Sequence, residues 1–143
     1  MELEGKIWKS KKFWLVEVPS LNLMTQGKSR SDALEMIKDA VMGLIDCYFE
    51  SEKGKDFDVI VNDYKKNIIG IAATDTKLLL ALSLRKQREK SGSTVREVSD
   101  RLGSKSPNAY AQYERGRIRI SLEKYEQLIQ AANPFKHSLL RIV

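Results

Sequence analysis

The segment from Thr94 to Gly116 constrains the fold of this chain more than any other, because it has the pattern of two short helices joined by a tight turn. Thr94 and Glu97 stand at capping-box spacing, with the hydroxyl first and the carboxylate three residues later. Apolar residues recur at helical spacing, at Val95, Val98 and Leu102. Gly103 suits the left-handed conformation that ends many helices, because it has no Cβ. The pattern predicts a short amphipathic helix that stops at Gly103.

A second helix is expected to begin at Ser106 and Pro107, because serine caps helices and proline needs no N–H donor in the first turn. Tyr110 and Tyr113 are expected to face the core rather than to stack on single-stranded bases. The opposite side of this helix carries Asn108, Ala109 and Gln112. Two helices in this order are typical of a helix-turn-helix, whose second helix enters the major groove of double-stranded DNA. Asn and Gln amides bind adenine through two hydrogen bonds, which makes them candidate base readers.

A set of polar, basic and small residues around this turn is predicted to contact DNA. The set consists of Thr94, Arg96, Lys105, Ser106, Asn108, Ala109, Gln112, Arg115 and Arg117. Basic residues beside a recognition helix typically bind phosphates, which positions the protein without reading base sequence. For the loop residues Arg115, Arg117 and Arg119, phosphate contact is the favoured interpretation and simple solvation is the alternative.

The charge of the chain is concentrated in the half that carries this motif. The net charge is +6, but residues 1–76 hold 11 basic and 13 acidic side chains, whereas residues 77–143 hold 14 basic and 6 acidic ones. Binding to a polyphosphate gains from cations and from counterion release, so this asymmetry favours a DNA-binding second half. Basic charge that only keeps a small domain soluble is the weaker alternative.

The flanks of the motif complete an all-α domain, expected over residues 75–143. Further helices are predicted from Lys77 to Ser91 and from Ser121 to Ala132, with Asn133-Pro134 as the stop. Four or five helices with the turn between the second and third resemble the XRE family of repressor domains. The best-matching residues are Arg85, Thr94, Glu97, Leu102-Gly103 and Tyr113-Glu114-Arg115-Gly116. Two departures are Val95, where the family usually has Gln, and a turn one residue longer.

Residues 1–74 are expected to form a different, α+β domain. Short segments rich in branched and aromatic residues predict strands at Leu3–Trp8, Phe13–Val18, Leu23–Gln26 and Phe57–Val61. A long amphipathic helix is predicted from Asp32 to Glu50. Ile68–Ala73 is either one more strand or a packed connector. The sum is a small antiparallel sheet backed by one helix.

This element order resembles the N-terminal domain of HicB antitoxins, which has a truncated RNase H-like fold. The matching residues are Val18-Pro19, Leu21, Thr25-Gln26-Gly27 and Ala33-Leu34, without the second proline, the glycine and the cysteine of the family's turn. The resemblance implies an antitoxin that masks a small HicA-like mRNA-cleaving toxin and represses its own operon, as a homodimer or higher homo-oligomer. The alternative is a stand-alone transcription regulator whose N-terminal domain senses a ligand or dimerises.

Catalysis has little support in the sequence. A metal-dependent nuclease would need convergent carboxylates, whereas the candidates are scattered: Glu17, Asp46, Asp58 and Asp63. Cys47 and His137 are the only cysteine and histidine, so no His/Cys metal cluster is expected, and Cys47 is expected to pack as a small hydrophobe. The chain is therefore expected to be a non-enzyme without metal or cofactor. Because it has one cysteine and no secretory or membrane-spanning segment, a cytoplasmic location is expected.

The C-terminal tail is unusually apolar for a chain end. Its large apolar residues are Phe135, Leu139, Leu140, Ile142 and Val143. The sequence does not decide whether this tail packs on its own chain or across a dimer.

Overall fold

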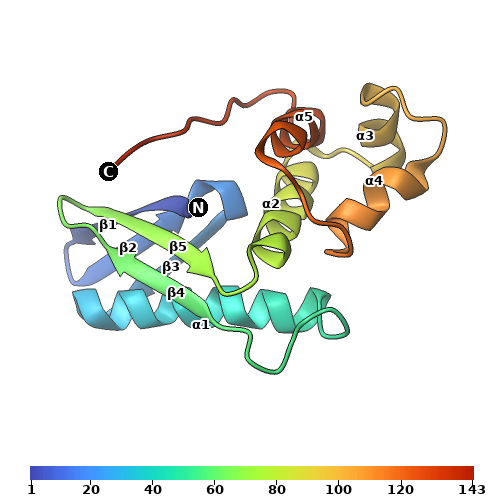
Figure 1. The fold of residues 1–143 in the computed structure, drawn as a ribbon. Coiled ribbons are helices and arrows are strands. Elements are labelled where there is room, and N and C mark those ends of the chain that lie inside the picture. Colours follow the sequence, from blue (N-terminus) through green and yellow to red (C-terminus); the bar gives the residue numbers. More distant parts are fainter. The chain divides into compact units, whose positions relative to one another are not determined.

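The computed structural model describes every residue from Met1 to Val143, and the chain divides into two compact units, Met1–Thr76 and Lys77–Val143 (Figure 1). The sequence predicts this boundary between residues 74 and 75. The first unit is a sheet with one long helix and the second contains helices alone, which confirms the α+β class. No helix combines the length and the apolar character needed to cross a membrane.

The first unit is a five-stranded antiparallel sheet in the order β3-β2-β1-β5-β4. Its strands are β1 (Leu3–Ser10), β2 (Phe13–Val18), β3 (Leu23–Gly27), β4 (Val59–Asp63) and β5 (Ile68–Ala73). Ile68–Ala73, left open by the sequence, is therefore a strand, and it pairs with both β1 and β4. A short 3-10 turn at Pro19–Leu21 ends β2, as the proline predicts. The order leaves β3 and β4 as the two edges of the sheet.

The core of this unit lies between the sheet and helix α1 (Arg30–Tyr48), which Figure 1 shows running along one sheet face. The helix turns a stripe at four-residue spacing toward the sheet. Its members, Ala33, Ile37, Val41 and Ile45, are all 0% exposed. Ile7, Val16 and Val18 are buried on the strands at two-residue alternation. A Cβ on Gly27 would lie 2.3 Å from the backbone nitrogen of Ala33, so only glycine lets β3 approach the start of α1.

Three predictions for this unit are wrong in detail. Helix α1 begins at Arg30 rather than at Asp32, because the hydroxyl of Ser29 accepts a hydrogen bond from Asp32 N at 3.1 Å and caps the helix. Strand β4 begins at Val59 rather than at Phe57, and Asp58 N bonds the hydroxyl of Thr74 instead. Cys47 is exposed rather than packed, because it follows Ile45 by two residues and so projects from the far side of the helix.

The second unit is a four-helix domain. Its helices are α2 (Thr76–Ser91), α3 (Val95–Arg101), α4 (Pro107–Glu114) and α5 (Leu122–Ala132). The residues after α5 form no regular element. All four helices occur where the sequence analysis expects helices, within a few residues at their ends.

Candidate nucleic-acid interface

Helices α3 and α4 and the turn between them are defined by local capping. Thr94 and Glu97 form the predicted capping box: Glu97 N donates to the Thr94 hydroxyl at 3.1 Å and Thr94 N donates to the Glu97 carboxylate at 3.2 Å. The backbone hydrogen bond lowers the pKa of the Glu97 carboxyl, with a further contribution from the Thr94 side chain. Gly103 has φ of +73°, so it supplies the left-handed stop that ends α3.

The longer turn is closed by serine hydroxyls. Ser99 and Ser104 donate to the carbonyl oxygen of Ser106, at 3.0 and 2.9 Å. The Ser106 hydroxyl in turn accepts from Asn108 N at 3.3 Å, and Pro107 occupies the first turn of α4. The extra residue of the turn therefore leaves the start of α4 well defined, at the position predicted.

A compact apolar core holds α4 against the other helices of this unit. Its buried members are Leu84, Val98, Tyr110, Leu128, Ile129 and Ala131, and Val95, Leu102, Tyr113, Ile120 and Tyr125 pack partly buried around them. The inward orientation predicted for both tyrosines is therefore confirmed. Tyr110 is 1% exposed, which rules out base stacking in this conformation. Burial raises the pKa of its phenol, and the nearby Glu114 carboxylate raises it further.

A buried ion pair ties the end of α4 to α2. Arg88 donates to both carboxylate oxygens of Glu114 at 2.6 to 3.0 Å and to the carbonyl oxygen of Ser93 at 3.1 Å. The two side chains are 16% and 7% exposed. The hydrogen bond to Glu114 raises the pKa of Arg88 while burial opposes it. Three charge-assisted hydrogen bonds between this guanidinium and this carboxylate thus fix the end of α4 against α2.

Sequence reasoning missed this pair. It singled out Arg85 as the matching arginine of the first helix, but Arg85 pairs with Glu89 on the same helix, at 3.0 Å and largely exposed. Arg88 lies nearly one turn further on and contacts Glu114 instead. The signal available in the sequence was Glu114 itself, since an acidic residue four positions after the inward-facing Tyr110 lies on the buried side of α4.

A second polar cluster joins the helix ends of this unit. Arg101 donates to the hydroxyl of Ser93 and to the carbonyl oxygen of Ala131, both at 2.8 Å. Ser91 donates to the carbonyl oxygen of Ala132 at 2.7 Å. These bonds satisfy carbonyl groups at the end of α5 that no helical partner reaches. They also use one of the arginines of the basic half for structure rather than for a ligand.

The predicted DNA-contacting residues lie mostly on the exposed side of this framework. Gln112 is half-buried, whereas the other predicted residues are exposed: Thr94, Arg96, Lys105, Ser106, Asn108, Ala109, Arg115 and Arg117. Asn108 and Gln112 are one helical turn apart on α4, away from Tyr110 and Glu114. The side-chain oxygen of Gln112 accepts from Arg117 at 3.4 Å, so two of the predicted DNA-contacting residues are in contact with each other. Thr94 and Ser106 serve as caps.

These side chains can present hydrogen-bond donors to a polyanion. When the Ser106 hydroxyl caps α4, it accepts the hydrogen bond from Asn108 N through an oxygen lone pair. Its proton therefore remains available to a phosphate oxygen. Arg96, Lys105 and Arg115 are exposed cations on three successive segments: α3, the turn, and the loop after α4. An amide-bearing helix face flanked by cations is the arrangement that reads bases and binds phosphates together.

The carboxylates considered for a nuclease remain dispersed in the first unit. Asp46 pairs with Lys53, Asp58 with Lys38 at 3.4 Å, and Asp63 with Arg30 at 2.8 Å. No group of three or more His, Cys, Asp or Glu residues has a geometry that could hold a metal ion. The contacts of these acids are those of surface ion pairs.

The comparisons with known proteins address the second unit. Residues 84–133 match the family model described as helix-turn-helix, and this range includes α3, the turn, α4 and α5. No curated protein matches the chain. The match and the geometry agree on where the motif lies. The chain therefore contains, at residues 84–133, a helix-turn-helix domain of the kind that DNA-binding regulators carry.

Proposed function

We propose that this protein is a non-enzymatic, cytoplasmic transcriptional repressor that binds its operator through α4 and also neutralises a HicA-like toxin through its first unit. The observation that carries the DNA-binding part is the outer face of α4 within a helix-turn-helix domain, where Asn108 is exposed and Gln112 is half-buried. The roles assigned to individual residues belong to this proposal.

Two classes of contact are proposed. The first class reads base edges. The amides of Asn108 and Gln112 bind adenine through two hydrogen bonds, and the methyl group of Ala109 contacts the methyl group of thymine. Thr94, Arg96, Lys105, Ser106, Arg115 and Arg117 bind the phosphate backbone. Base readers discriminate between sequences, whereas phosphate contacts add the same affinity to every duplex.

The two classes respond differently to mutation. Asn108→Ala or Gln112→Ala should lose about 1–3 kcal/mol on the operator and little on random DNA. Arg96→Ala or Arg115→Ala should weaken both duplexes alike and reduce the salt slope by about one. Fluorescence anisotropy against salt, with operator and scrambled duplexes of equal length, measures both effects. Gln130→Ala, an exposed amide on α5, is the matched control. Equal losses on both duplexes for all variants would show that the base readers are wrongly assigned.

We propose a homodimer as the DNA-binding form. Two recognition helices on one dimer can meet half-sites about 34 Å apart, and a single eight-residue helix such as α4 offers few base contacts by itself. Operator footprints with twofold symmetry and a stoichiometry of two chains per site would support this state. One chain per site at saturation would contradict it.

The antitoxin role is supported only by the element order of the first unit, three strands, a long helix and two further strands, which resembles the order expected for HicB antitoxins. Co-expression with the neighbouring small open reading frame tests it. A toxic neighbour that forms a stable complex with residues 1–76 supports the proposal. A chain that binds its operator but has no toxic neighbour would be the stand-alone regulator instead, with a first unit that senses a ligand or dimerises.

A further inference from the structure

The loop after α4 folds back onto the last turn of that helix. Gly116 is buried and has φ of +73°, the left-handed conformation that lets the chain reverse. The N–H of Gly116 donates to the carbonyl oxygen of Tyr113, and the N–H of Arg117 donates to that of Gln112, both at 3.1 Å. These two bonds form a Schellman motif, which fixes the backbone of Arg117 beside Gln112.

The side chains of Arg117 and Gln112 also meet. Nη1 of Arg117 donates to Oε1 of Gln112 at 3.4 Å, which is long for a hydrogen bond and adds little stability. The contact nevertheless selects one orientation of the amide, because a guanidinium carries donors and no acceptor. If the amide turned over, its NH2 group would face the donors of Arg117. Oε1 therefore faces the arginine, and Nε2 lies on the other side of the amide.

The orientation of this amide decides which base Gln112 can read. The last torsion of a glutamine is broad and nearly twofold, so an unsupported amide presents its donor and acceptor in either order. Adenine needs one order, because its N7 accepts and its N6 amino group donates, whereas N7 and O6 of guanine both accept. An amide that turns freely can donate to either acceptor of guanine through a single bond, so it discriminates less. Oε1 has two lone pairs, and the bond from Arg117 leaves one for adenine.

We propose that Arg117 is a positioning residue that determines specificity through Gln112, because it holds the amide in the orientation that reads adenine. This role depends on the base reading proposed above for Gln112. It is compatible with the phosphate contact proposed for Arg117, since a guanidinium has several N–H donors and gives one of them to Gln112. Loss of the Arg117 side chain should therefore change which sequences bind, in addition to weakening every duplex.

Selection by the full chain from a pool of randomised duplexes identifies the preferred sequence. Fluorescence anisotropy then gives a discrimination ratio, the Kd of a scrambled duplex divided by the Kd of the selected duplex. Arg117→Met keeps the backbone bond to Gln112 but removes the side-chain donor. It should lower the ratio roughly five- to tenfold, within the range of one bidentate base contact. At the base pair where Gln112→Ala abolishes the preference, Arg117→Met should broaden it from adenine to other bases.

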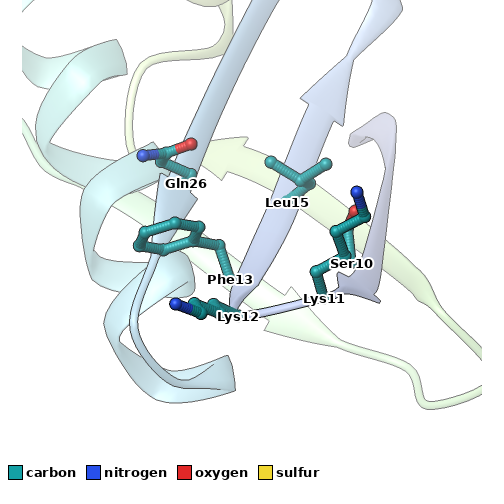
Figure 2. A pocket seen from close by; sticks show the side chains of 6 residues that line it. All are labelled: Ser10, Lys11, Lys12, Phe13, Leu15 and Gln26. Carbon is teal, nitrogen blue, oxygen red and sulfur yellow. The ribbon is translucent and has the colours of Figure 1, made fainter.

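Two matched variants control for the loss of positive charge. Arg115→Met removes an exposed cation from the same loop and should weaken the selected and scrambled duplexes by the same factor. Lys12→Met removes an exposed cation from the hollow at the β1–β2 turn, outside the helix-turn-helix domain, and should change neither affinity (Figure 2). In a Gln112→Ala chain, Arg117→Met should lower the ratio no further, because its effect on specificity passes through the amide.

NMR relaxation without DNA tests the orientation by itself. The order parameter of the Gln112 side-chain amide should fall in Arg117→Met and stay unchanged in Arg115→Met. An unchanged order parameter in Arg117→Met, or an unchanged discrimination ratio, would overturn the positioning role and leave base reading by α4 in place. A further fall of the ratio in the Gln112→Ala chain would also overturn it, because Arg117 would then read bases directly. A wild type that selects no sequence would instead refute base reading by α4, and the role of Arg117 with it.

Discussion

Replacing Glu114 with glutamine tests whether the buried ion pair fixes the recognition helix. The substitution keeps the shape of the side chain but removes the charge that compensates Arg88. The guanidinium stays ionised without Glu114, because the pKa of an arginine lies far above neutral pH even in folded proteins. It keeps its bond to the carbonyl oxygen of Ser93 at 3.1 Å but loses its anionic partner in a site where its side chain is only 16% exposed.

The magnitude follows from this burial. Removing one partner of a buried pair typically costs about 3–5 kcal/mol. Because Arg88 is partly exposed and keeps one hydrogen bond, the expected loss is about 3 kcal/mol, the lower end of this range. At an m-value of about 1.5 kcal/mol/M, the urea midpoint of the second unit should fall by roughly 2 M. Circular dichroism during urea unfolding measures this shift.

A double-mutant cycle supplies the control. Arg88→Met with Glu114→Leu removes both charges together, so the double variant should be more stable than either single variant. Arg85→Met, which breaks the exposed pair with Glu89 on the same helix, should cost at most about 0.5 kcal/mol. A loss below about 1 kcal/mol for Glu114→Gln, or additive losses in the double variant, would refute the reasoning that burial makes this pair decisive.

Three further predictions concern packing and ionisation. Gly27→Ala should destabilise the first unit by several kcal/mol, because the added Cβ would meet the backbone of Ala33. Gly43→Ala, in the interior of α1 where an added Cβ meets nothing, should instead stabilise this unit by about 0.5–1 kcal/mol. Thermal melts of the two variants and the wild type measure both effects. Tyr110→Phe should change the free energy of unfolding by less than about 1 kcal/mol, because the buried hydroxyl lies near Glu114 but makes no hydrogen bond of normal geometry. A larger loss in urea unfolding would contradict this expectation. The hydrogen bond from the Arg30 guanidinium lowers the pKa of Asp63 to about 2. The stabilisation of the fold by this ion pair is therefore present above the unfolded pKa of 3.8 and is lost as the pH falls toward 2. In Arg30→Met, an NMR titration should show the pKa of Asp63 returning toward 3.8.

Local signals in the sequence predicted the second unit well. Thr94 with Glu97, Gly103, and Ser106 with Pro107 each fix a helix end through bonds within a few residues, so their pattern alone is sufficient. The periodic tyrosines of α4 were placed correctly for the same reason. In the first unit, alternation and helical spacing predicted the elements, but the edge positions of β3 and β4 depend on pairing between residues far apart in sequence.

Long-range polar pairs were beyond the reach of the sequence pattern. Arg85 and Arg88 are three positions apart on one helix, and only the path of the chain decides which of them meets Glu114. The same holds for Arg101, whose partners Ser93 and Ala131 come from the ends of other segments. Cys47 is a different case, because its two-residue distance from the buried Ile45 already places it on the far side of the helix, so the spacing alone was sufficient to predict its exposure.

The structure of α4 explains how one framework can serve different operators. A helix of eight residues is unstable by itself in water, so its position depends on contacts of its inner side. Tyr110 and Glu114 make those contacts through the core and through Arg88. Asn108 and Ala109 on the outer side are exposed and contribute little to packing. Because stability and the proposed base reading rest on opposite sides of α4, base preference can change by substitution at exposed positions while the inner side keeps the helix in place.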